Sequence, residues 1–395
     1  MIKGVKNSLY SIFIIISAIL VVMEASISRV FPIIDYYDEM FSIIIFVMFL
    51  CDLHGKINKN IFKIILALCL LIIIGTFGNL MTDINLNAFI MGVDALGVIK
   101  VFISLISIKE LTNRTTKKAI VSALSFFISI FILICFLFYF VTYSGGNSEF
   151  FSEARFGIKS YSFIMTNPGE LGYLLMGMFL LLTLDTKKRL LIKMMTLFLI
   201  LTTTKGPQIL FVLIFLFLKF FIGKKRINSI HLISITIITL IIGQYQIHNY
   251  LLNETSVRYI LNLTSLQIAK DHFPIGSGLA TFGSELSRVY YSDIYYQYNL
   301  SSIWGISPVY SYFINDNYWA MILGQFGFIG CMLMIYVLYK TYYLIKSVKP
   351  LVNVEEKSVA TALYFAFIIG SVGSAYLTSS SGLFCFMILG LYLAV

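Results

Sequence analysis

The stretch FFISIFILICFLFYFV, residues 126–141, has no charged side chain and is almost entirely apolar. It approaches the roughly 20 apolar residues that an α-helix needs to cross a bilayer. A second run of the same kind, SIFIIISAIL, covers residues 11–20. Only 12% of the 395 residues are charged, whereas a soluble domain has about a quarter. These features predict a polytopic membrane protein and exclude a soluble enzyme.

Apolar runs alternate with charged breaks along the whole chain, which predicts an all-α fold of about twelve transmembrane helices. Nine of them fall within residues 1–247 and three within 317–395. Residues 248–316 form the one long polar interval between these two groups. The predicted spans are 5–23, 38–53, 61–80, 86–108, 119–142, 161–184, 188–203, 207–222, 229–247, 317–345, 357–375 and 379–395.

The distribution of basic residues predicts the orientation, because lysine and arginine accumulate in cytoplasmic loops. Of the 29 basic residues, 21 lie in alternate breaks and only seven lie in the other set. We therefore expect both termini to be cytoplasmic and the 248–316 loop to face the periplasm or the cell exterior. The net charge of +10 has the same origin and does not indicate a nucleic-acid partner. The basic breaks include 56–63, 109–118, 187–193, 219–226 and 340–357.

The five cysteines all fall in or at the ends of apolar segments. None has the C-x-x-C spacing of a metal site, and none lies in the long polar interval. We therefore expect buried structural thiols, no disulfide framework, no bound metal and no cofactor.

The segment 194–223 lies between two strongly basic flanks, so both of its ends should be cytoplasmic. A single helix would cross only once, so we predict two short helices joined by the turn TTTKGP, residues 202–207. Each crossing is about 22 Å long, less than the roughly 30 Å of hydrocarbon. Lys205 is therefore predicted to lie below the outer surface, in a cavity that is open to the outside.

Charge within a membrane span is costly and by default suggests function, which draws attention to Asp94, Lys100 and Glu170. Asp94 and Lys100 lie on different sides of one span, so we expect each to find a partner on another span. Glu170 opens the sixth span within TNPGELGYLL, residues 166–175. It fits two interpretations: a first-turn residue that suits the helix dipole, or a carboxylate that faces an outer cavity.

The outer side carries few basic residues, and Arg155, Arg258 and Arg288 are the arginines nearest the long polar interval or within it. A single outer arginine is normally just solvated, but several at one place would bind phosphate, which guanidinium grips bidentately. Arg258 opens the segment RYILNLTSLQIAK, residues 258–270. The apolar positions of this segment roughly follow helical spacing and predict an amphipathic helix on or near the membrane.

The segment DHFPIGSGLATFG, residues 271–283, contains three glycines after a proline. Nucleotide-binding glycine loops need a strand before them and a helix after them, and this segment lacks that context. Gly276 and Gly278 are predicted instead to shape the loop, because glycine lets the backbone turn sharply or approach a ligand.

Four landmarks follow one another between residues 150 and 345: an outer arginine before TNPGELGYLL, then LTTTKGPQIL, then SVRYILNLTSLQIAKDHFPIGSGLATFG, and last NDNYWAMILGQFGFIGCMLMIYVLY. In these landmarks the chain resembles the O-antigen ligase/polymerase superfamily, especially Wzy-type O-antigen and capsular repeat-unit polymerases. Residues 1–140 match only as a set of spans. The chain departs from the family at two positions. Asn315-Asp316-Asn317 stands where ligases have a histidine, and Lys205 stands where arginine is usual.

The resemblance implies a GT-C-like glycosyltransferase in the bacterial inner membrane, with its active site facing the periplasm. The implied substrate is an undecaprenyl-diphosphate-linked oligosaccharide in membrane lipid. A chain-length regulator and a flippase of the same pathway are the implied protein partners. No Asp-x-Asp motif occurs in the predicted outer loops, so the expected reaction is metal-independent.

The resemblance also implies roles for single residues. Arg258 and Lys205 are the first candidates for binding the diphosphate, and Arg155 and Arg288 come next. Asp316 is the candidate for orienting or deprotonating the acceptor hydroxyl, and the reserve candidate is Glu170. The glycine turn would let the outer loop fold over a cavity that holds a lipid-linked sugar.

Two other functions stay open. A flippase for the same lipid-linked units also fits twelve spans, cytoplasmic termini and charges within the membrane. Against it, transporters of that kind have short outer loops and matching half-repeats, which we do not find in this sequence. A ligase to lipid A core is the second alternative, and the absence of the ligase histidine argues for a polymerase instead.

Overall fold

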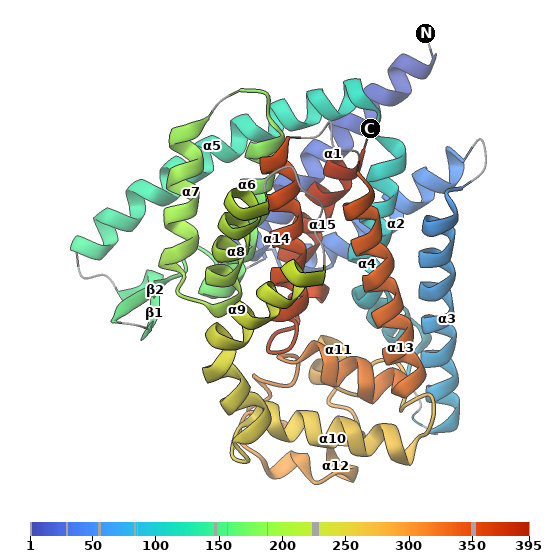
Figure 1. The fold of residues 1–395 in the computed structure, drawn as a ribbon. Coiled ribbons are helices and arrows are strands. Elements are labelled where there is room, and N and C mark those ends of the chain that lie inside the picture. The colour runs from blue at the N-terminus through green and yellow to red at the C-terminus, as the bar shows by residue number, and fades with distance from the viewer. Residues whose placement is uncertain are drawn as a thin grey trace.

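The structure is a computed structural model, and it is mostly helical (Figure 1). It describes residues 2–28, 31–53, 57–82, 84, 86–145, 148–155, 157–187, 189–222, 229–348 and 353–394. The helices are α1 (Ile2–Ile27), α2 (Tyr37–Cys51), α3 (Lys59–Met81), α4 (Ala88–Leu111), α5 (Arg114–Ser144), α6 (Pro168–Leu184), α7 (Leu190–Thr202), α8 (Gly206–Phe217), α9 (Ser229–Ile247), α10 (Val257–Asp271), α11 (Glu285–Val289), α12 (Ile294–Gln297), α13 (Tyr318–Ser347), α14 (Val354–Gly370) and α15 (Ser380–Leu393).

The apolar helices support the prediction of a membrane protein. Within the described residues, α3, α4, α5 and α13 are long and apolar enough to cross a membrane. Shorter apolar helical segments occur at 8–24, 168–184, 190–202, 206–221 and 380–393. Each of the twelve predicted spans coincides with a described helix, although the ends differ by several residues.

Asparagine defines where many of these helices begin. An asparagine side chain at the N-cap accepts a hydrogen bond from a backbone N–H of the first turn, which would otherwise lack a partner. This arrangement starts α3, α4, α5, α6, α13 and α14, at Asn58, Asn87, Asn113, Asn167, Asn317 and Asn353.

The core lies where α15 packs against α4 and α6. The side chains of α6 and α15 are buried on nearly all sides, which agrees with sequences that are apolar all round. Helix α1 begins and α15 ends at the same end of the bundle, opposite the layer of α10, α11 and α12 (Figure 1). At that end Lys117 Nζ donates to the carbonyls of Tyr392 and Ala394, at 3.3 and 2.8 Å.

Several of the basic residues on which the predicted orientation is based lie outside the described residues. They are Arg29, Lys56, Lys188, Lys224, Lys225, Arg226 and Lys349.

The all-α prediction needs one correction. Residues 151–155 and 158–161 form an antiparallel hairpin, β1 (Phe151–Arg155) and β2 (Ile158–Tyr161), which turns at Gly157 with a φ of +77°. The sixth predicted span was to begin at residue 161, but α6 begins at Pro168. Proline is favoured in the first turn of a helix and disfavoured in its interior, so the helix starts there.

The prediction of two short helices around TTTKGP is confirmed. Helix α7 ends at Thr202 and α8 begins at Gly206, with Pro207 in its first turn. The backbone of Thr204 has a φ of +50°, which prevents one continuous helix.

The segment 258–270 is helical as predicted, but its buried face differs from the apolar stripe read from the sequence. In α10 the buried side chains include Leu261, Thr264 and Ile268, and this helix packs against α13. Of the apolar positions in this segment, Ile268 is buried but Leu263 is 51% exposed. Packing against α13 therefore decides the rotation of α10.

The glycine-containing segment, residues 271–283, is hydrogen-bonded to a kink in α13. Gly327 has a φ of +62° within α13, which interrupts the helical hydrogen bonds and frees the carbonyls of the preceding turn. Those of Gly324 and Gln325 accept the backbone N–H groups of Ser277 and Gly278, both at 2.9 Å. The outer segment is therefore bonded directly to the interrupted helix.

The same segment also contacts α3 and α4. Asn79 on α3 makes two hydrogen bonds to the backbone of Leu279, from Nδ2 to the carbonyl at 2.9 Å and from the N–H to Oδ1 at 2.8 Å. Asp94 on α4 accepts the backbone N–H of Ala280 at 2.7 Å. This partner of Asp94 lies away from its own helix, but in the outer segment rather than on another span as expected, and it is a backbone group.

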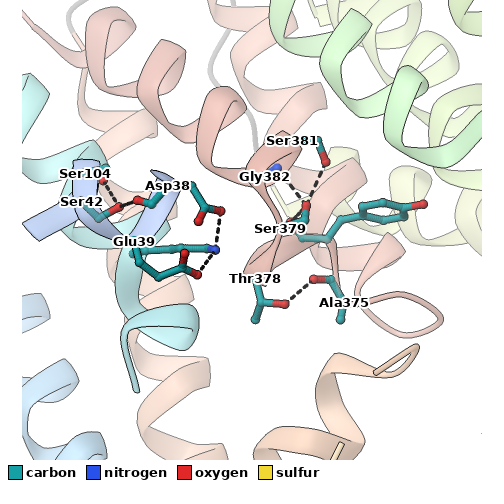
Figure 2. A network of polar contacts seen from close by, with 11 residues as sticks. Asp38, Glu39, Ser42, Ser104, Ala375, Thr378, Ser379, Ser381 and Gly382 are labelled. Atoms are coloured by element: carbon teal, nitrogen blue, oxygen red, sulfur yellow. Dashed lines mark hydrogen bonds and ion pairs between the residues drawn. The ribbon is translucent and has the colours of Figure 1, made fainter. Parts of the chain in front are cut away.

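Lys100 is buried in α4 and pairs with two carboxylates of α2 (Figure 2). Its Nζ lies 2.5 Å from Asp38 Oδ2 and 2.6 Å from Glu39 Oε1. Beside this pair, Ser104 Oγ of α4 donates to Ser42 Oγ of α2 at 3.0 Å. These contacts confirm that the partners of Lys100 lie on another helix, and they fix how α2 packs along α4.

We expect Gly278→Ala to lower the melting temperature of the detergent-solubilised protein strongly. Gly278 has a φ of +101°, and an added Cβ would lie 2.3 Å from the backbone nitrogen of Asn79. Such strain costs about 1–3 kcal/mol before the clash is counted. The control is Gly92→Ala in α4, where a Cβ meets nothing within 4 Å. Equal melting temperatures for the two variants would contradict the docked position of this segment.

We expect Lys100→Met to destabilise the protein by about 3–5 kcal/mol, because it leaves two buried carboxylates without their cation. Lys109→Met, on the same helix, removes a half-exposed ion pair with Glu110 and should cost less than about 1 kcal/mol. Adding Asp38→Asn and Glu39→Gln to Lys100→Met should restore part of the loss. Thermal unfolding monitored by intrinsic fluorescence measures all three, and a triple variant less stable than Lys100→Met would refute the pairing.

Candidate functional site

Lys205 lies in the turn between α7 and α8. It is the N-cap residue of α8 and has an extended backbone, with φ −90° and ψ 143°. The hydroxyl of the preceding Thr204 is hydrogen-bonded to Ser160 Oγ on β2. The β-hairpin therefore holds the turn that presents Lys205.

Arg258 and Asp316 form an ion pair between α10 and the start of α13. Arg258 Nη2 donates to Asp316 Oδ2 at 2.6 Å, and the two side chains are 27% and 31% exposed. One residue further on, Asn317 Nδ2 donates to Asn262 Oδ1 of α10 at 2.8 Å. Two adjacent residues thus tie α10 to the beginning of α13.

Tyr250 lies against the guanidinium of Arg258. The centre of its ring is 4.6 Å from Arg258 Cζ, within the range of a cation–π contact. The carbonyl of Tyr250 accepts Asn262 Nδ2 at 3.2 Å, which holds the ring relative to α10. Arg258 Nε is buried and makes no hydrogen bond to any described residue.

Lys205 lies within electrostatic range of this pair and of the hairpin. Burial and, to a smaller extent, the positive charges of Arg155 and Arg258 lower the pKa of Lys205 to about 8. Asp316 and Glu153 oppose the shift. We call Lys205, Arg258, Arg155 and Asp316 the cationic cluster.

Two opposing effects act on the pKa of the Asp316 carboxyl. Burial raises its pKa, while the charges of Arg258 and Lys205 act against that rise. Asp316 is therefore a partly buried carboxyl that depends on its two cationic neighbours for its charge.

Tyr376 connects the cluster to the start of α6. It lies in the short 3-10 helix Tyr376–Thr378, and its hydroxyl donates to Asn167 Oδ1 at 2.6 Å. Burial, the neighbouring Tyr173, and the carboxylates of Glu170 and Asp316 raise the pKa of Tyr376. Both predicted carboxylates therefore lie within electrostatic range of one tyrosine.

Glu170 has a role at the start of α6. Its Oε2 accepts the hydroxyl of Thr166 at 2.5 Å and the backbone N–H of Thr166 at 3.2 Å. Its own N–H donates to Asn167 Oδ1 at 3.0 Å. This geometry matches the helix-start interpretation of Glu170.

Arg288 is placed differently from the other predicted cations. It forms an ion pair with Glu285 on α11, with Nε 3.0 Å from Oε2. The same carboxylate accepts Asn315 Nδ2 at 2.6 Å. Among the described residues, no recorded interaction joins Arg288 to Lys205 or to Arg258.

Gly276 and Gly278 lie at the docked turn and not among the charged residues of the cluster. Gly276 has a φ of +75°, and a Cβ there would lie 2.5 Å from the backbone nitrogen of Gly327. Their closest neighbours are therefore backbone atoms of α13 and α3.

The sequence did not single out two residues of this site, Tyr250 and Tyr376. The chain contains 25 tyrosines, so tyrosine itself carries no signal. Tyr376 does lie in the three-residue interval between two predicted spans, which could have drawn attention to it.

The arrangement suits an anion next to a proton acceptor. Lys205, in the α7–α8 turn, lies within electrostatic range of Arg155 on β1 and of the Arg258–Asp316 ion pair between α10 and the start of α13. Within the described part of the chain, no group of three or more His, Cys, Asp or Glu side chains could hold a metal ion.

We expect the pKa of Lys205 to be near 8 when measured from the pH dependence of its acetylation by mass spectrometry. Arg155→Ala should raise this pKa, because it removes a positive charge that disfavours the protonated amine. The matched control is Lys159→Ala on the same hairpin, where the side chain is exposed. An equal pKa in the wild type and in Arg155→Ala would contradict the placement of Arg155 beside Lys205.

Comparison with known proteins does not show which family the chain belongs to. No protein-family model matches the chain, and no curated protein matches it. The chemistry of the cationic cluster therefore follows from its own side chains.

Proposed function

We propose that this protein is a glycosyltransferase of the bacterial inner membrane, an O-antigen or capsular repeat-unit polymerase with a GT-C-like fold. In this proposal all twelve apolar helices cross the membrane, both termini are cytoplasmic, and residues 248–316 lie in the periplasm. The enzyme transfers a growing glycan from undecaprenyl diphosphate to the next lipid-linked repeat unit. The resemblance described above supplies the substrate class.

The observation that carries the proposal is that Lys205 lies within electrostatic range of Arg155 and of the Arg258–Asp316 ion pair. These residues come from four separate segments of the chain. A solvated arginine needs no such neighbours. Bringing like charges together is costly unless an anion binds among them, and the proposed donor carries a diphosphate.

The proposed chemistry needs charge stabilisation and orientation, because the leaving group is already a diphosphate. Arg258 and Lys205 bind its phosphate oxygens, and Arg155 adds positive charge. The bond from the sugar anomeric carbon to the diphosphate oxygen breaks, and its electron pair stays on the diphosphate. The acceptor hydroxyl oxygen forms the new bond, and its proton passes to Asp316.

A second candidate function is transport of the same lipid-linked units. The buried Lys100, Asp38 and Glu39 favour it, because ionisable residues within a membrane often mark a transport route. A structural explanation of these residues is already at hand, since they join α2 to α4. The ligase alternative has less support, because Asn315-Asp316-Asn317 opens α13 without the family's histidine.

Deleting the gene in the bacterium that carries it should leave surface polysaccharide with a single repeat unit, because flipping and ligation continue without polymerisation. A silver-stained gel shows this pattern, and the gene supplied on a plasmid should restore the ladder. Loss of even the single unit would contradict the proposal. Units trapped inside the membrane would then indicate a flippase, and full polymer left on its carrier outside would indicate a ligase.

Variants connect this pattern to the cationic cluster. Arg258→Ala combined with Lys205→Ala should remove the ladder, since losing two donors to a developing charge costs at least about 100-fold in rate. Lys270→Ala is the matched control, because this exposed lysine lies in the last turn of the same helix as Arg258. Unchanged polymer amount and length in a well-expressed double variant would end the proposal.

A further inference from the structure

The carboxylate of Asp316 occupies the place on Arg258 where a phosphate oxygen would bind. Guanidinium recognises carboxylate and phosphate by the same planar fork of N–H donors. In the structure Asp316 takes one donor of that fork, Nη2, at 2.6 Å. The ion pair therefore stands in for part of an anion site.

The pair is held by fewer contacts than the fork allows. The buried Nε of Arg258 makes no hydrogen bond to any described residue. Tyr250 fixes the plane of the guanidinium from one side, with its ring 4.6 Å from Cζ. Both partners are about a quarter to a third exposed, at 27% and 31%, so solvent weakens their attraction.

A diphosphate would make more contacts at the same place. It carries more negative charge than one carboxylate, can accept from both Nη2 and Nε, and would also be attracted by Lys205. The charge of Lys205 acts on Asp316, so Lys205 lies within electrostatic range of the ion pair. An incoming diphosphate therefore outcompetes Asp316 for Arg258.

We propose that Asp316 is a built-in competitor of the donor diphosphate, and that binding of the diphosphate displaces its carboxylate from Arg258 and frees it to accept the acceptor's proton. This inference rests on the proposed function. A carboxylate paired with arginine is a weak base, and one released from it is a stronger base. The proton acceptor is thus switched on only when the donor is in place.

Asp316→Asn separates binding from transfer, because asparagine has the same shape but cannot neutralise Arg258. Inorganic pyrophosphate is the binding probe, and its affinity for the solubilised full-length protein is measured by isothermal titration calorimetry. Asp316→Asn should bind pyrophosphate roughly tenfold more tightly than the wild type, the scale of one charge-assisted hydrogen bond. In cells the same variant should lose the polysaccharide ladder. A merely structural role would weaken both.

Glu285→Gln is the matched control. It releases another arginine of the same loop, Arg288, from its carboxylate, but no recorded interaction places Lys205 or a stacked tyrosine beside Arg288 among the described residues. Its pyrophosphate affinity should stay within about twofold of the wild type. Equal tightening in both variants would show a general charge effect and would overturn the inference.

Arg258→Ala distinguishes failure of the inference from failure of the proposed function. If the wild type binds pyrophosphate and Arg258→Ala does not, but Asp316→Asn binds no more tightly, only the competition is refuted. If the wild type and Arg258→Ala bind equally, the diphosphate site itself is refuted.

A measurement on the wild type covers the case in which Asp316→Asn does not fold. Carbodiimide labelling of Asp316, followed by mass spectrometry, should increase as pyrophosphate is added, because the displaced carboxylate is no longer held by Arg258. Labelling that stays constant up to saturating pyrophosphate would overturn the inference.

Discussion

The arrangement of the outer segment depends on one interruption in α13. The positive φ of Gly327 removes helical hydrogen bonds, and the carbonyls of Gly324 and Gln325 then need other donors. The backbone N–H groups of Ser277 and Gly278 supply them. A buried carbonyl without a partner would cost about 1–3 kcal/mol, so the kink and the docked segment are stable only together. Because α10 precedes this segment and also packs on α13, the kink fixes where α10 lies, and with it Arg258.

The buried charges in the other half of the chain act on packing more than on stability. Removing Lys100 and two carboxylates from water is costly, and replacing them with apolar groups of the same size is often neutral or stabilising. Their benefit is specificity, since a lysine in α4 pairs correctly only when α2 lies at one height along it. The 3-10 helix that carries Tyr376 contacts α4. The packing of α4 therefore also bears on the position of Tyr376 beside Asp316.

Hydropathy and charge predicted the helices well, because each apolar run must form its own backbone hydrogen bonds and asparagine caps mark several helix starts. They could not predict the hairpin at 151–161, whose residues form a pair only through the turn at Gly157. They did not predict that Leu263 of α10 is exposed while Ile268 is buried, since a helix packed on protein need not follow the stripe expected at a membrane. Of the four predicted site cations, Arg155 and Arg258 lie within electrostatic range of Lys205. Arg288 pairs with Glu285 instead. Sequence spacing does not predict which residues far apart in the chain come into contact. The contact of Tyr250 with Arg258 and the partners of Lys100 are therefore visible only in the structure.

The cationic cluster also shows why lysine and arginine are not interchangeable within it. The guanidinium of arginine is always charged, so an arginine at position 205 would repel Arg155 and Arg258 permanently. Lys205 stands in this position, and its pKa of about 8 lets it lose its proton within a pH unit or so of neutrality. Below that pH Lys205 adds a positive charge to those of the two arginines, and above it the repulsion among them falls. A lysine in this turn therefore keeps the charge that an anion would need, and it limits the cost of the cluster when no anion is bound.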